Sequence, residues 1–115
     1  MAIKFNHRRE ILALRDGIPK YLEAYTPIKV KWESSFAEYD FRDAYISGKG
    51  KNEKLVLSTK IFVGLKNLPV IFKEDIAGEL TIEINGVTIY TIKPSGRISK
   101  GLVKAFTQSI IKGIR

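Results

Sequence analysis

Apolar positions in the first part of the chain recur with the period of a helix. The stripe spans residues 6–25 and consists of Ile11, Leu14, Ile18, Leu22 and Tyr25, at three- and four-residue spacing. Asn6 is a candidate N-cap. Gly17 and Pro19 interrupt the stripe, and a proline inside a helix removes a backbone hydrogen bond and clashes with the preceding turn. We therefore expect a break at Gly17, with a second short helix starting at Pro19, in preference to one kinked helix.

After Thr26-Pro27 the period changes to two, which is typical of half-buried strands. Apolar and polar residues alternate across 28–33, where Val30 and Trp32 are separated by Lys31. Aromatic and aliphatic residues predict two more strands, at 38–47 and 55–63. A glycine-rich, charged turn is expected between them, at 47–54.

The strongest local signal is Asn85-Gly86, which lies between two β-branched runs in the segment 79–93. This dipeptide predicts a two-residue type I′ turn, because both turn positions need positive φ. In the resulting register Ile84 faces Val87, Ile82 faces Ile89 and Leu80 faces Thr91, all on one side of the sheet. Tyr90 and Ile92 are then expected on the opposite side.

A final helix is predicted over residues 100–114, with Ser99 as its cap. It has an apolar row, Leu102, Phe106, Ile110 and Ile114, and a polar row, Lys100, Lys104, Gln108 and Lys112. At about 100° per residue the two rows lie roughly 160–200° apart, so one face is buried and the other exposed.

These elements predict a single α+β domain over residues 1–115. We expect an antiparallel meander sheet of four to five strands, with the N-terminal helical region and the C-terminal helix packed on one face. The expected core comprises Trp32, Ile82, Ile84, Val87, Ile89, Leu102, Phe106 and Ile110.

Composition fits an ordinary globular domain of 115 residues, with 44% hydrophobic and 28% charged residues. The absence of cysteine excludes disulfides and thiolate metal sites. No secretory signal is visible, and no apolar run approaches the ~20 residues needed to cross a bilayer. We expect a soluble, cytoplasmic protein without membrane contact; a viral protein acting in the host cytoplasm would look the same.

Charge is distributed unevenly along the chain. The formal net charge is +8, and the 32 residues after Glu83 contribute +6 of it without any carboxylate. Such an uneven charge distribution in a small domain is typical of a face that meets an anionic partner, which can be nucleic acid, an anionic membrane surface or an acidic protein. The alternative is a face that only keeps the protein soluble.

The sequence lacks the residue combinations that catalytic sites usually need. We therefore expect no enzymatic activity, no cofactor and no metal. His7 is the only histidine and is expected to be solvent-exposed. Gly48-Lys-Gly-Lys51 lacks the spacing of a phosphate-binding loop. Glu38, Asp40 and Asp43 could hold Mg²⁺, but a solvated strand face is the better interpretation.

The favoured function is non-enzymatic binding of DNA or RNA through the phosphate backbone. Lysines on one helix face can displace counterions from phosphates, and a helix N-terminus also favours phosphate. The candidate contact residues are Arg97, Lys100, Lys104, Lys112 and Arg115, together with Lys49 and Lys51 in the glycine-rich turn.

A strand, Asn85-Gly86, a strand, Gly96-Arg-Ile-Ser-Lys100 and Lys104 together resemble the last third of a double-stranded-RNA-binding domain. The resemblance implies that Lys100 and Lys104 touch phosphates; Gly101 stands at the third lysine position of that family. It covers under a third of the chain. The family's Gly-Pro-x-His loop has no counterpart, and bulkier residues replace its alanine-rich helix face, so no family is assigned.

The alternative function is a protein–protein or assembly module. If helices cover only one face of the sheet, the other face is exposed and semi-apolar, which suits a homodimer or another protein partner. A ribosomal accessory protein, a viral structural subunit and an inhibitor from a mobile element fit this interpretation equally.

Overall fold

The computed structural model describes residues 5–25, 27, 29–33, 44–94, 104, 105, 107, 108, 110 and 112. The elements in chain order are α1 (Arg8–Tyr25), β1 (Val30–Trp32), β2 (Tyr45–Ser47), β3 (Lys54–Val63), β4 (Lys66–Asp75), β5 (Leu80–Ile84) and β6 (Val87–Ile92). A short 3₁₀ turn, Gly50–Asn52, joins β2 to β3. The α+β class predicted from the sequence is confirmed.

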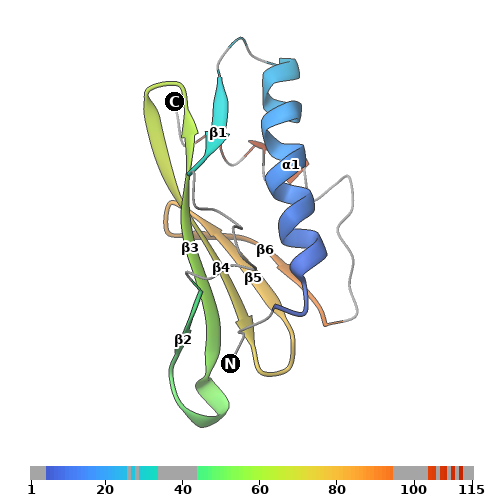
Figure 1. The fold of residues 1–115 in the computed structure, drawn as a ribbon, viewed down its shortest axis with the longest axis vertical. Helices are drawn as coiled ribbons and strands as arrows, with labels where there is room; N and C mark the ends of the chain where they lie inside the picture. The colour runs from blue at the N-terminus through green and yellow to red at the C-terminus, as the bar shows by residue number, and fades with distance from the viewer. Residues whose placement is uncertain are drawn as a thin grey trace.

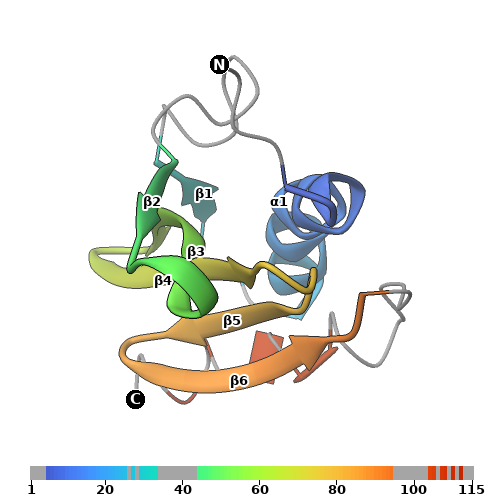
Figure 2. The ribbon, with the colours of Figure 1, turned by 90° about the horizontal axis from the view of Figure 1, so that it is seen from below.

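The sheet is antiparallel and has six strands, one more than the four to five predicted. Strands β3 to β6 form a meander, and β1 and β2 pair with the two ends of β3 on its other side. α1 lies against one face of the sheet, which we call the helix face (Figures 1 and 2). The opposite face is called the outer face.

The core lies between α1 and the helix face. Every second residue of the long strands is buried there: Leu57, Ile61 and Val63 in β3, Leu68, Val70 and Phe72 in β4, and Leu80, Ile82 and Ile84 in β5. The predicted stripe of α1 packs on them through Ile11, Leu14, Ile18 and Leu22. The apolar stripe of the helix, with its period of 3.6, therefore packs against the alternate apolar residues of the strands.

α1 is one continuous helix with Pro19 inside it, so the predicted break at Gly17 is wrong. Pro19 has no N–H to donate to the carbonyl of Arg15, four residues earlier. The indole Nε1 of Trp32 donates to that carbonyl instead, at 2.9 Å. The hydrogen bond that proline removes from the helix is thus replaced from β1.

The start of α1 also differs from the prediction. The helix begins at Arg8, and its first turn is capped by a distant side chain in place of Asn6. The carboxylate of Glu74 in β4 accepts the backbone N–H of Asn6 at 2.8 Å and that of His7 at 3.0 Å. A carboxylate at this position both satisfies free donors and complements the positive end of the helix dipole.

β4 is the strand that sequence reasoning missed. Its residues alternate clearly between buried and less buried, but Pro69 stands in the run, and proline argues against a central strand. The Pro69 carbonyl accepts the N–H of Asn85 at 2.9 Å. Because the nitrogen of a strand residue points to the same side as its carbonyl, the ring nitrogen of Pro69 faces the β5–β6 turn, where pairing with β5 has ended.

The Asn85-Gly86 turn is confirmed, with φ of 53° at Asn85 and 83° at Gly86. The predicted register holds for Ile84 and Val87 and then shifts at a bulge, so that Ile82 pairs with Tyr90 and Leu80 with Ile92. Ile92 is therefore buried, where exposure on the opposite face was expected. The expected burial of Val87 is also wrong, since it lies at the turn on the sheet edge and is 63% exposed.

The rest of the predicted core agrees in part. Ile82, Ile84 and Ile110 are buried, whereas Ile89 and Trp32 are half-buried against the core. Lys104, Ala105, Thr107, Gln108, Ile110 and Lys112 are helical. They lie on the same side of the sheet as α1 (Figure 2). The remaining residues of the predicted helix, including Leu102 and Phe106, and the predicted strand segment 38–43 lie outside the described residues.

Within the described part of the chain, no helix combines the length and the apolar character needed to cross a bilayer.

Candidate nucleic-acid interface

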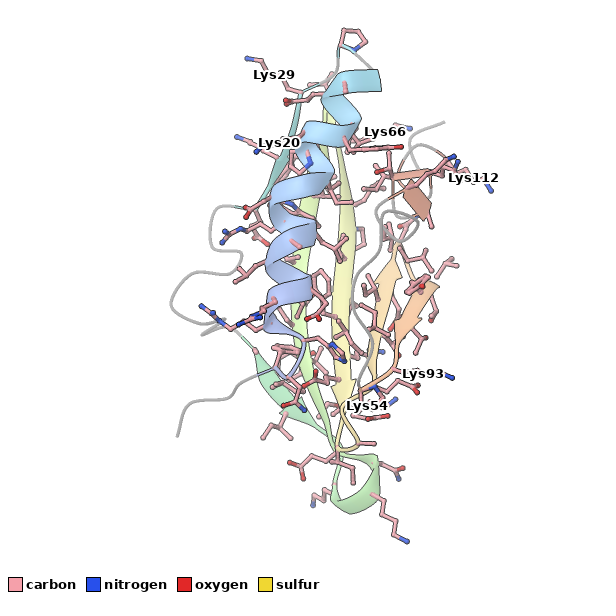
Figure 3. All side chains as sticks on the ribbon, turned by 90° about the vertical axis from the view of Figure 1, so that its right-hand side faces the viewer. Lys20, Lys29, Lys54, Lys66, Lys93 and Lys112 are labelled. Carbon is pink, nitrogen blue, oxygen red and sulfur yellow. The ribbon has the colours of Figure 1, made fainter. Side chains whose placement is uncertain are left out.

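The structure describes four of the seven basic residues proposed from the sequence. Lys104 and Lys112 are exposed, whereas Thr107 and Ile110 of the same helical segment are buried. Lys112 lies in the upper half of the molecule (Figure 3). Arg97, Lys100 and Arg115 lie outside the described residues.

Lys49 and Lys51 are exposed, but they are not brought together with the C-terminal lysines. They lie in and beside the 3₁₀ turn between β2 and β3. This turn is at the lower end of the molecule (Figure 1), whose longest dimension is 45 Å, and Lys112 is in the upper half. A single short ligand would therefore not reach both groups.

A second basic group lies on the outer face and was not identified from the sequence. Val30 pairs with Val63, and both are buried on the helix face. The next pair, Lys31 and Phe62, therefore points to the outer face, because side chains alternate along a strand. Lys29, just before β1, and Lys60 in β3 each lie two residues from a member of this pair and share its face. We call Lys29, Lys31, Lys60 and Phe62 the outer-face cluster.

Backbone hydrogen bonds hold the cluster in register at both ends. The N–H of Gly64 donates to the carbonyl of Lys29 at 3.0 Å, and the N–H of Glu33 donates to the carbonyl of Lys60 at 2.9 Å. Residues directly opposite each other on paired strands have Cβ atoms about 5 Å apart, and neighbours on one face of one strand are about 7 Å apart. By this spacing Lys31 has both Lys29 and Lys60 as near neighbours on the outer face, whereas Lys29 and Lys60 lie at opposite ends of the cluster.

Little negative charge opposes the outer-face cluster. Lys29, Lys31 and Lys60 are exposed, and none of them forms an ion pair with another described residue. Glu33, half-buried opposite Lys60, is the nearest described carboxylate by register. Further along the outer face, the Nζ of Lys73 lies 2.8 Å from Glu83 Oε2, so this lysine is neutralised. The cluster is therefore a cationic surface suited to phosphate.

A signal for this cluster was present in the sequence. Alternation across 28–33 already separated Lys29 and Lys31 from Val30 and Trp32. What the sequence did not supply was the pairing of β1 with the far end of β3. That pairing adds Lys60 and Phe62 to the same face.

His7 is 2% exposed, so the expectation of a solvated surface residue is wrong. Its ring Nε2 lies 2.9 Å from the carbonyl oxygen of Gly78, which can only accept, so Nε2 is the donor. Nδ1 lies 3.6 Å from Glu10 Oε2. The hydrogen bonds of His7 to Glu74 in β4 and to Gly78 in the β4–β5 connection hold the start of α1 against the sheet. The role of His7 is therefore structural.

No group of three or more histidine, aspartate or glutamate side chains among the described residues is arranged to hold a metal ion. The acidic residues Glu38, Asp40 and Asp43 lie outside the described residues.

A cavity of about 230 Å³ opens beside the start of α1, between the ends of β2, β3 and β4. Its lining includes the apolar residues Ile46, Leu55 and Ile76, the carboxylates of Glu53, Glu74 and Asp75, and one cation, Lys54. Both carboxylate oxygens of Glu74 already accept backbone N–H groups. The negative charge around this cavity does not suit phosphate.

Comparison of the chain with protein-family models, with curated proteins and with solved structures gave no match.

Proposed function

We propose that this chain is a small, non-enzymatic protein that binds the sugar–phosphate backbone of nucleic acid. The observation that carries the proposal is the outer-face cluster, in which Lys29, Lys31 and Lys60 are exposed and unpaired among the described residues. Each lysine that meets a phosphate releases condensed counterions, which favours binding without reading sequence.

The basic C-terminal segment is a second contact surface in this proposal. Lys104 and Lys112 are exposed on a segment whose buried residues, Thr107 and Ile110, fix its orientation. Arg97, Lys100 and Arg115 extend the same run of positive charge in the sequence. The net charge of +8 would draw a polyanion toward the whole molecule and increase the rate of encounter.

The test is the salt dependence of binding to fluorescently labelled single strands and duplexes, measured by anisotropy between about 50 and 200 mM salt. The combined change of Lys29, Lys31 and Lys60 to alanine should weaken binding and make the slope of log K against log salt shallower by roughly 2–3 units. A second variant, K104A/K112A, measures the C-terminal contribution. The absence of salt-sensitive binding by the wild-type protein would refute the proposal.

A matched control separates these lysines from the general charge of the protein. Lys20, Lys54 and Lys93 are also exposed and lie on other parts of the fold (Figure 3). Changing these three to alanine removes the same charge. If the control variant loses as much affinity as the outer-face variant, binding is nonspecific attraction to a basic protein and the assigned surface is wrong.

The alternative function, assembly with a second protein, is favoured by the edge strand β6. This strand ends the sheet order and carries no charged residue, and Val87 and Tyr90 are 63% and 39% exposed. Unpaired edges can accept another strand. A solution mass that exceeds the monomer and returns to it in a Tyr90→Lys variant would support this function.

A further inference from the structure

Phe62 differs from the aromatic residues of the core. Phe72 and Phe5 are 0% and 4% exposed, whereas Phe62 is half-buried and belongs to the outer face. An aromatic ring that packs only part of its surface on its own sheet retains surface for a ligand. Because Phe62 lies between lysines, this surface combines an apolar ring with positive charge.

The residues around Phe62 are either small or positively charged. Lys31 lies directly opposite it on β1, and Lys60 lies two residues before it on β3. Gly64, two residues after it, has no side chain. On β4 the opposite residue is Asn67, which is short, polar and exposed. These neighbours supply two ammonium groups, and the nearest described carboxylate is that of Glu33, which lies diagonally from the ring, opposite Lys60.

This combination matches the chemistry of an unpaired nucleotide. Every base has an apolar π-face that can stack on an aromatic ring, and every nucleotide has a phosphate that can meet a lysine. In a duplex the base faces are stacked inside the helix, so a duplex can use the lysines but not the ring. A single strand can use both.

We infer that Phe62 is a stacking platform for a base of single-stranded nucleic acid and that the protein binds single strands in preference to duplexes. This inference rests on the proposed function, because the lysines of the outer-face cluster must hold the backbone for a base to reach the ring. Stacking depends little on which base is present, so single strands of both DNA and RNA are ligands of this surface.

The experiment compares Phe62→Leu with Phe62→Trp on labelled oligothymidylate, oligouridylate and a mixed-sequence duplex. Leucine keeps an apolar side chain of similar burial but removes the π-face. We expect Phe62→Leu to weaken binding of both single strands by roughly 5- to 100-fold and to leave duplex binding unchanged. The salt slope should also stay unchanged, because no charge is removed. Phe62→Trp should retain single-strand affinity.

The Phe62→Trp variant supplies a direct readout. The chain has one natural tryptophan, Trp32, whose indole is hydrogen-bonded to α1, so its emission reports the fold. The emission that Phe62→Trp adds should be quenched by oligothymidylate and not by the duplex. This measurement remains decisive if Phe62→Leu folds poorly.

The outcomes distinguish the two proposals. If the wild-type protein shows no salt-sensitive binding, both are overturned. If it binds and the outer-face lysines matter, but Phe62→Leu keeps its single-strand affinity and the emission added by Phe62→Trp is not quenched, only the stacking inference is overturned. If Phe62→Leu lowers the affinity for single strands and for the duplex equally, the stacking inference is also overturned, because a duplex base cannot stack on the ring.

Discussion

The indole N–H of Trp32 in β1 donates a hydrogen bond of 2.9 Å to the backbone carbonyl of Arg15 in α1. This is the carbonyl that the missing N–H of Pro19 leaves without its helical donor. The bond explains how an 18-residue helix continues through a proline. It also fixes the position of β1 relative to the helix.

A double-mutant cycle tests this relationship. Trp32→Phe leaves the Arg15 carbonyl without a donor, and we expect it to lower the free energy of unfolding by about 1–3 kcal/mol. Pro19→Ala restores a backbone N–H at the right position. In the Pro19→Ala background Trp32→Phe should therefore cost about 1 kcal/mol less, as measured by urea denaturation. Equal costs in the two backgrounds would mean that the indole does not substitute for the helical bond.

Glu74 should be the most important single carboxylate for stability among those described. Glu74→Gln keeps the shape of the side chain but replaces one acceptor oxygen with an NH₂ group that faces a backbone N–H. We expect a loss of about 2–3 kcal/mol in the free energy of unfolding, because hydrogen bonds to charged acceptors are strong and the helix dipole loses its counter-charge. Glu79→Gln is the control, at a half-buried neighbour whose side chain makes no such bond to the described residues, and should change stability by less than about 0.5 kcal/mol.

Thr59 is the opposite case, because removal of its hydroxyl group should increase the stability of the fold. Its Oγ1 is buried without a hydrogen-bond partner among the described residues, at a position that is 4% exposed and paired with Val70. Thr59→Val has nearly the same shape and removes the cost of desolvating the hydroxyl. We expect a gain of about 1 kcal/mol in thermal or urea unfolding. Thr88→Val, at an exposed position of β6, measures the intrinsic strand preference of valine; a gain equal to that at Thr59 would contradict the explanation.

Two glycines separate backbone strain from steric clash. Gly86 has φ of +83° but open space where a Cβ would stand, so Gly86→Val should cost only the conformational penalty of about 1–2 kcal/mol. A smaller change, Gly86→Ala, should cost about 1 kcal/mol for the same reason. Gly48 has φ of +84° and a Cβ there would lie 2.4 Å from the carbonyl oxygen of Asn52. Gly48→Ala should therefore cost clearly more than Gly86→Ala, in the same denaturation assay.

Local patterns predicted the elements that depend on nearby residues. The stripe of α1, the alternation in β1 and β3 and the Asn85-Gly86 turn all follow from residues a few positions apart. The bulge in β6 does not. A two-residue turn predicts simple pairing, whereas the extra residue at Ile89 brings Ile92 opposite Leu80, where it is buried. That burial depends on the completed core.

The same distinction applies to the candidate site. The charge of the C-terminal segment was visible in the sequence, and the exposure of Lys104 and Lys112 agrees with the predicted helix face. The outer-face cluster was not visible as a unit, because Lys31 and Phe62 become neighbours only through strand pairing. Pro69 concealed β4 for a related reason, since its tolerance depends on where β5 ends.

The cap on α1 has a consequence for the order of events during synthesis. His7 and its acceptor Glu74 are 67 residues apart in the chain. At ribosomal rates of 5–20 residues per second, the acceptor is made about 3–13 s after the helix start. During this interval the nascent helix lacks both its cap and the sheet that buries its apolar stripe. A chaperone that shields exposed apolar segments would therefore bind α1 during this interval, and its release would follow the emergence of the β4–β5 region.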